Sequence, residues 1–189
     1  MATVAASYVA VAAVYGSAVA VDAVKANETA WATLTGATSA VMGKAVAVLS
    51  GLNPDSYADM AAVAASQTAM AAIAASQTAM AAIAASSTAR TAITNSATAK
   101  NALASSPLKT TVTKGNGNGW ENRTIRNGMG YLISCYNANS GGEAGSTWYK
   151  LDGAQTSQPA GTTNVGKFFT SSLAIYWWSS TSSVTYIPC

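Results

Sequence analysis

The chain has 189 residues, of which 50% are hydrophobic but only 8% aromatic and 9% charged, so most of its apolar side chains are small and bury little area each. The net charge of +3 arises after residue 106, where six scattered Lys and Arg outnumber three acids, and scattered cations do not indicate a nucleic-acid partner. The sequence contains no histidine, which excludes Ser-His-Asp and Cys-His catalysis.

Residues 1–21 carry no charged side chain and could be interpreted as a signal peptide or a membrane span. They lack the basic start of a signal peptide, and Ala, Ser, Thr and Gly dilute their hydrophobicity. They also follow the repeat described next. We therefore interpret them as its first units, without membrane insertion.

A ten-residue repeat dominates the N-terminal half, and residues 65–86 read ASQTAMAAIAASQTAMAAIAAS. Ser recurs in one column from Ser66 to Ser106, and a large apolar residue such as Met70 is followed three positions later by another, such as Ile73. The spacing extends back to Met1 with one slip of a residue around GLNPDS, 51–56. Such repetition indicates stacking or supercoiling.

The residue types favour helix, and the mean apolar spacing of about 3.3 residues is shorter than the 3.6 of an α-helix. Long helices with this spacing would wind tightly around like partners. We therefore expect an elongated, coiled-coil-like homotrimeric shaft over 1–106, with a break near 51–56. An alternative is that each decad is a short helix ended by Ser or Thr and stacked in a solenoid. The expected trimer core comprises Met60, Val63, Met70, Ile73, Met80, Ile83, Ile93 and Leu103.

Two units, SQTAMAAIA at 66–74 and at 76–84, resemble the Ala-rich repeats of bacteriophage tail-fibre and other virion fibre proteins. The resemblance extends over 1–106 and is strict over 60–106. It implies a slender homotrimer in the virion, assembled in the bacterial host cytoplasm, with one end on other virion proteins and a β-rich tip at the other.

The composition changes at Pro107, and we expect the helix to end there. Residues 107–119, which include GNGNG, read as a flexible Gly/Asn-rich joint, and no strand or helix flanks them as a phosphate-binding loop would require. We expect residues 120–189 to form a small β-rich tip domain of four to six strands. The candidate strands are 130–137, 146–153, 167–180 and 183–188. Asp152-Gly153 predicts a turn, and ANSGGEAG predicts a loop. The expected fold class is α+β.

Aromatic residues gather in this tip. Adjacent residues of a strand face opposite sides, so Trp177 and Trp178 cannot both point inward. The cluster predicts either a core between subunits or a surface for sugars, with Asn, Ser and Thr as hydrogen-bond partners. The candidate receptor-binding residues are Trp120, Trp148, Tyr149, Tyr176, Trp177 and Trp178.

Catalysis has little support in the sequence. Glu121, Glu143 and Asp152 are the carboxylates of the tip, and no spacing selects two of them as a glycosidase pair. We expect no enzyme, cofactor or metal site. Cys135 and Cys189 could pair or stay free.

The sequence thus predicts a phage tail fibre whose tip binds a glycan or protein of the host surface. The alternative is a head fibre or capsid decoration protein without a receptor role. An ice-binding helix, suggested by the regular Thr column, is a third hypothesis.

Overall fold

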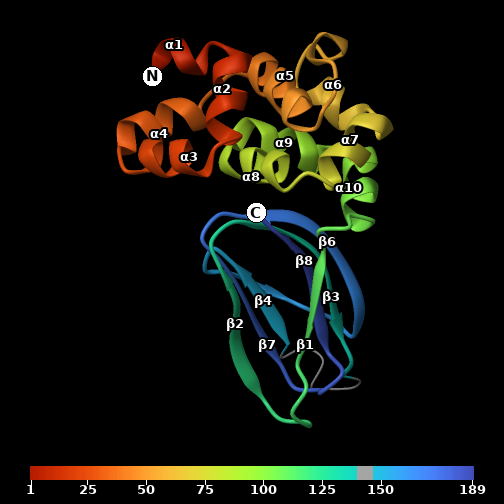
Figure 1. Ribbon diagram of the computed structural model, residues 1–189. Coiled ribbons are helices and arrows are strands. Elements are labelled where there is room, and N and C mark those ends of the chain that lie inside the picture. The colour runs from red at the N-terminus through yellow and green to blue at the C-terminus, as the bar shows by residue number, and fades with distance from the viewer. Residues whose placement is uncertain (140–146) are drawn as a thin grey trace. The chain divides into compact units, whose positions relative to one another are not determined.

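In the computed structural model, which describes residues 1–139 and 147–189, each decad of the strict repeat forms one short helix (Figure 1). The Ser column supplies the N-caps. Ser76 Oγ, for example, accepts the backbone N–H of Ala79 at 3.2 Å, as N-capping residues commonly do. A helix of eight or nine residues plus its cap fills the decad. The ten-residue period is therefore a period of helix starts.

Successive helices turn sharply at these caps, with bends of 99°, 89° and 102° at three of the breaks. Most of the helices then lie against the helix three places along the chain. Helix α5 packs on α2, α8 on α5, α9 on α6 and α10 on α7. The N-terminal half is thus a solenoid with about three helices per turn, which is the architecture of the second interpretation of the decads.

Serine hydroxyls also join the turns of this solenoid. The hydroxyl of Ser76, whose oxygen caps α8, also donates a hydrogen bond to the carbonyl oxygen of Leu49 at 3.0 Å. Ser96 Oγ likewise caps α10 and donates to the carbonyl oxygen of Ala64 at 2.6 Å. One hydroxyl therefore satisfies a helix start and a helix end that lie far apart in the sequence.

The expectation of a long coiled-coil shaft was wrong. The helices break at every cap and fold back on one another, so one chain buries the apolar stripe that we assigned to a trimer core. Ala side chains allow the close helix packing that this requires. All eight stripe residues are fully buried within the single chain: Met60, Val63, Met70, Ile73, Met80, Ile83, Ile93 and Leu103.

Among the described residues, no single helix has the length and apolar composition to cross a membrane, although three sharply bent helix pairs meet those two criteria together. The helical unit spans Met1–Leu108. Its helices are α1 (Ala2–Ala5), α2 (Tyr8–Tyr15), α3 (Ala18–Lys25), α4 (Glu28–Thr35), α5 (Ser39–Leu49), the 3₁₀ helix η1 (Pro54–Ser56), α6 (Met60–Ala65), α7 (Gln67–Ala74), α8 (Gln77–Ala85), α9 (Ser87–Asn95) and α10 (Ala97–Ala104).

The second unit, Lys109–Cys189, is a sandwich of two antiparallel four-stranded sheets, ordered β1-β8-β3-β6 and β2-β7-β4-β5. The mixed α+β class is therefore confirmed. Side chains from both sheets, among them Leu132, Phe169 and Trp177, form its core. The strands are β1 (Thr110–Thr113), β2 (Glu121–Asn127), β3 (Gly130–Asn137), β4 (Trp148–Leu151), β5 (Ala154–Ser157), β6 (Gly161–Phe169), β7 (Ser172–Trp177) and β8 (Ser183–Pro188).

The Gly/Asn-rich segment, interpreted from sequence as a joint, belongs to this sandwich. Strand β1 lies within 107–119, and GNGNG forms the loop that leads from β1 to β2. The backbone N–H of Gly115 donates to Ser180 at 3.0 Å, and that of Gly119 donates to Trp178 at 3.0 Å. Asn116 and the glycines of the loop adopt positive φ, which explains their residue types.

Candidate functional site

The sheet β2-β7-β4-β5 has one face in the core and one face toward solvent. Along β7, Leu173, Ile175 and Trp177 are buried, whereas the alternate residues are half-buried. The register pairs Tyr176 with Trp148 of β4 on the outer face. Alternation of side chains therefore places two aromatic rings side by side outside the core.

Four rings on this outer side form a continuous cluster, which we call the aromatic ladder: Trp120, Tyr176, Trp148 and Trp178. Trp120 stacks on Tyr176 with ring centroids 4.7 Å apart and planes 7° from parallel. Tyr176 in turn stacks on Trp148 at 5.3 Å and 19°. Trp178 meets Trp120 edge to face at 5.4 Å.

The stacked rings contact one another through their faces. Tyr176 has a ring on each face, and Lys150 Nζ lies over the ring of Trp148, 4.6 Å from its centroid. An ammonium and a stacked ring cannot share one face, so the lysine covers the free side of Trp148. Ring edges carry the positive end of the aromatic quadrupole.

Four of the six candidate receptor-binding residues meet in the ladder, and two do not. Trp177 is fully buried and Tyr149 is 4% exposed; both belong to the core between the sheets. Trp177 and Tyr149 alternate along their strands with Trp178, Tyr176 and Trp148. This alternation explains why two candidates are buried in the core and the others lie on the outer face. A direct contact of Trp177 or Tyr149 with a receptor is thus excluded by their burial. The expectation that Trp177 and Trp178 differ in burial is confirmed.

Sequence reasoning expected Asn, Ser and Thr beside the aromatic residues without naming them, and it missed Lys150. Asn122 lies opposite Tyr176 across β2 and β7, and Ser157 lies opposite Trp148 across β4 and β5. Lys150 follows Trp148 by two positions and shares its face. The two-residue period of β4 was visible in the sequence, but the strand pairing was not. Asn122, Ser157 and Lys150 supply hydrogen-bonding groups beside the rings.

A nearly buried lysine fixes the loop that leads to Trp120. Lys114 is 5% exposed, and its Nζ donates to the carbonyl oxygen of Gly117 at 2.9 Å. Glu121 Oε2 lies 4.0 Å from the same nitrogen. The ion pair and the hydrogen bond restrain the residues on both sides of Trp120, so the ring stacks on Tyr176 without a large ordering cost.

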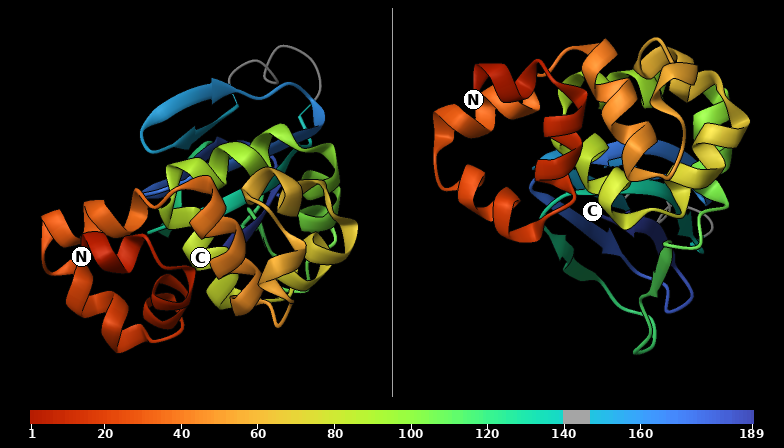
Figure 2. Two further views of the ribbon diagram at one scale, coloured as in Figure 1. Left: turned by 90° about the horizontal axis from the view of Figure 1, so that it is seen from above. Right: turned by 45° about the horizontal axis from the view of Figure 1, so that its top comes forward.

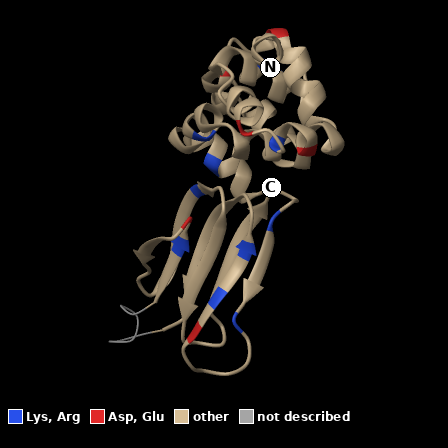
Figure 3. Ribbon diagram, turned by 90° about the vertical axis from the view of Figure 1, so that its left-hand side faces the viewer, with Lys and Arg blue, Asp and Glu red and all other residues tan. Residues whose placement is uncertain are grey.

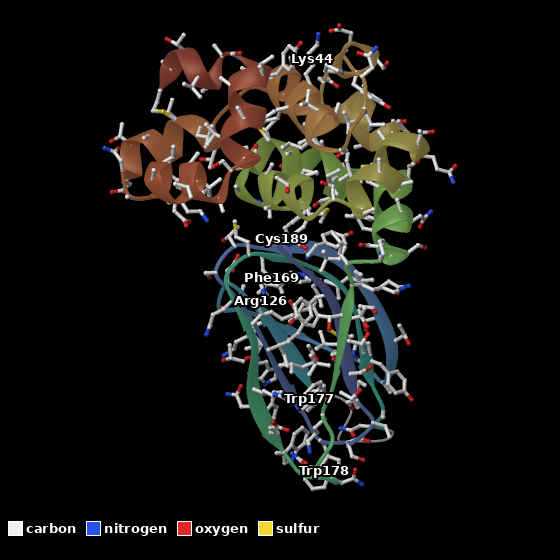
Figure 4. The ribbon with its side chains drawn as sticks, viewed as in Figure 1. Lys44, Arg126, Phe169, Trp177, Trp178 and Cys189 are labelled. Carbon is white, nitrogen blue, oxygen red and sulfur yellow. The ribbon has the colours of Figure 1, made fainter. Side chains whose placement is uncertain are left out.

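The ladder lies at one end of the sandwich. In Figure 4, Trp178 marks that end, and Arg126, Phe169 and Cys189 lie toward the other. Strand β1 runs from the second end toward the ladder, because Thr110 pairs with Tyr186 and Thr113 with Ser183. The chain therefore enters the β unit at the end opposite the ladder.

The basic side chains of the β unit are scattered over its strands (Figure 3). On the side shown in Figure 3, the Lys and Arg residues of the β unit are distributed over several strands and form no continuous stripe. In the helical unit, a surface groove of about 510 Å³ lies between α7 and α10. Its lining is Ala and uncharged polar residues, with no pair of ionisable groups: Gln67, Ala71, Ala74, Thr98, Asn101, Ala102, Ser105 and Pro107.

The described carboxylates of the β unit do not form a catalytic pair. Glu121 is paired with the last residue of β7, and Asp152 accepts hydrogen bonds from Thr170, Ser171 and Ser172, where β7 begins. The two ends of β7 lie about 17 Å apart at about 3.4 Å per residue, well beyond glycosidase spacing. Glu143 lies outside the described residues, as does most of the loop expected over 138–145.

Other reactive groups offer no alternative site. Within 1–139 and 147–189, no three His, Cys, Asp or Glu side chains cluster as metal ligands would. Cys135 and Cys189 are both free thiols. Burial raises the pKa of each to about 12, although Arg126 partly offsets this for Cys189. Thiols with such a pKa are poor nucleophiles at neutral pH.

No model of a known protein family matches this chain. A comparison with curated proteins also found no match.

Proposed function

We propose that the chain is a fibre component of a bacteriophage particle and that its β unit binds glycans of the host surface through the aromatic ladder. The proposed glycan binding rests on the ladder. Four rings on the solvent side of one sheet, with amide, hydroxyl and ammonium groups beside them, form an apolar strip with a polar border, as binding surfaces commonly do. The virion role rests on the resemblance of the decads.

The ladder favours saccharides that are rich in acceptor oxygens. Ring edges and Lys150 both attract negative charge. The residues after 106 carry six basic and three acidic side chains, which favours encounter with a negatively charged polysaccharide. We therefore expect acidic glycans to bind more tightly than neutral ones. Several copies of the chain in one particle, as a homotrimer or otherwise, would multiply weak contacts.

The test compares the full-length chain with Trp148→Ala on a panel of acidic and neutral bacterial surface polysaccharides. Loss of Trp148 removes one ring of the ladder, which is also the ring that Lys150 contacts. We therefore expect the affinity for the polysaccharide to fall at least about tenfold. Tyr136→Ala is the matched control, since Tyr136 is a 42% exposed aromatic residue of the other sheet. Equal affinities of all three proteins, or no binding to any polysaccharide, would contradict a receptor role.

One observation favours the second candidate, a head fibre or decoration protein without a receptor role. Because Tyr176 has both faces covered and Lys150 covers Trp148, the ladder also stabilises the outer face of an otherwise thin sheet. Under this hypothesis, Trp148→Ala lowers the unfolding temperature of the β unit while no polysaccharide binds the wild-type protein. The same experiment therefore separates the two functions.

A further inference from the structure

The apolar stripe of the decads is covered in most of the solenoid but not in α3. In the decads capped by Ser66, Ser76, Ser86 and Ser96, the stripe positions are four and seven residues after the cap, as Met70 and Ile73 are after Ser66. After Ser17, the cap of α3, the same positions are Val21 and Val24. These two are only half-buried. Helix α3, all eight residues of which are described, has no buried side chain.

The stacking pattern explains why α3 is uncovered. Its main contacts are with its chain neighbours α2 and α4, whereas α6, three helices later, packs instead on α9. The extra segment around η1, with the slip in the repeat, separates α3 from the helix that would otherwise cover it. In Figure 2, the red and orange helices α1 to α4 form an open loop beside the densely packed yellow and green helices.

A second substitution pattern makes the opposite face of α2 and α3 more apolar. Two positions after the cap, the strict decads carry a polar Thr, such as Thr68 and Thr78. The equivalent residues of α2 and α3 are Val9 and Val19, which are 60% and 80% exposed. Valine has nearly the shape of threonine without its hydroxyl. At about 100° per residue, Val19 lies on the side of α3 opposite to Val21 and Val24, so these valines form a separate exposed apolar surface that the stripe does not include.

We propose that α3 packs against α3 of a second copy of this chain. The choice of a second copy as partner follows from the repeat. Elsewhere in the solenoid, the same stripe is covered by another Ala-rich helix. A second copy of the chain provides such a helix, with the same small residues. A two-fold antiparallel pair of α3 helices, centred between Ala23 and Val24, sets Asp22 of each copy beside Lys25 of the other. The charges are thus self-complementary, as a two-fold interface requires.

Sedimentation of the full-length chain at increasing concentration tests the proposal. The wild type should pass from monomer to dimer. Val21→Ser with Val24→Ser should weaken association at least about tenfold, while its helical circular dichroism stays that of the wild type. Val48→Ser is the matched control, because Val48 is 41% exposed on α5 and outside the stripe; this variant should associate like the wild type.

Charge exchange tests the orientation and identifies the occupant as a second copy. Asp22→Lys alone places two pairs of like charges together and should weaken the dimer, and Lys25→Asp alone should do the same. The double variant restores opposite pairs and should recover most of the association. Lys25 also lies over the ring of Trp31 at 5.2 Å, so recovery is expected to be incomplete. A wild type that stays monomeric, or association that none of these substitutions changes, would overturn the proposal.

Discussion

At the scale of single residues, Asp152 stabilises the junction between two turns. It stands at the β4–β5 turn with positive φ, as the Asp-Gly pair predicts. Its carboxylate accepts the backbone N–H groups of Thr170, Ser171 and Ser172 at 2.7 to 3.1 Å. Partial burial raises the pKa of this carboxyl, but the hydrogen bonds outweigh it and lower the pKa from 3.8 to about 2. The ionised form is therefore the one that stabilises the fold.

Asp152 should make the β unit sensitive to acid. A lowered pKa gives stability that is fully present above the unfolded value of 3.8 and is lost as pH falls toward about 2. Thermal unfolding followed by tryptophan fluorescence between pH 5 and 2 should show this loss. Asp152→Asn should be less stable at neutral pH and should lose part of the acid dependence. An unchanged pH profile in the variant would contradict the assignment.

Gly43 of α5 lies close to the backbone at the start of α6. A Cβ at this position would lie 2.7 Å from both the carbonyl oxygen of Asp59 and the nitrogen of Met60. Backbone atoms cannot move aside as a flexible side chain can. Gly43→Ala should therefore lower the free energy of unfolding by about 1–3 kcal/mol, measured by denaturant titration of the helical signal. Lys44→Ala, which removes the surface ion pair with Asp55 and the contact of Lys44 with the ring of Tyr8, should lower the free energy of unfolding much less than Gly43→Ala.

At the scale of elements, the Ser column performs two tasks, and substitution at Ser96 can separate them. Ser96→Ala removes the cap of α10 and the bond to Ala64, each typically worth about 1 kcal/mol. Ser96→Asp keeps a capping oxygen but has no proton to donate when ionised. We expect both to lower the unfolding midpoint, with alanine the larger loss if capping dominates. An aspartate variant as stable as the wild type would show that the bridge to Ala64 contributes little.

Individual elements were predictable where the local pattern was strong. The strands expected at 130–137 and 183–188 have those bounds as β3 and β8, because alternating apolar and aromatic residues match a half-buried strand. Strand β2, with the sequence ENRTIRN, was missed because it is an edge strand with mostly polar side chains. The four rings of the ladder could be nominated from composition. Their assembly could not, since it depends on register between strands distant in sequence.

At the scale of the whole molecule, the two units have separate cores, and substitutions in one should leave the other intact. Trp177 is fully buried in the sandwich, and Trp177→Ala should cost the β unit about 3–5 kcal/mol. The helical signal near 222 nm should keep its own unfolding transition. Loss of both transitions together would show that the units fold as one cooperative body.

The main error of sequence interpretation arose at this scale. An apolar stripe with a ten-residue period fits either helices wound around other chains or short helices stacked within one chain. The stripe itself does not distinguish the two, because both bury Met70 and Ile73. The distinguishing signal was the Ser column from Ser66 to Ser106: a Ser at the same place in successive decads is a poor choice for the interior of a long helix and a good choice for repeated N-caps.

The capped decad also has a genetic consequence. Near-identical units encoded in tandem are prone to gain or lose copies during DNA replication, and each such event adds or removes a whole helix with its cap. With bends near 100° at the caps, one extra decad redirects the chain by roughly a quarter to a third of a turn, whereas three extra decads nearly restore its direction. Variants that differ by three decads would therefore keep the direction in which the following segment runs. Variants that differ by one or two decads would rotate that direction.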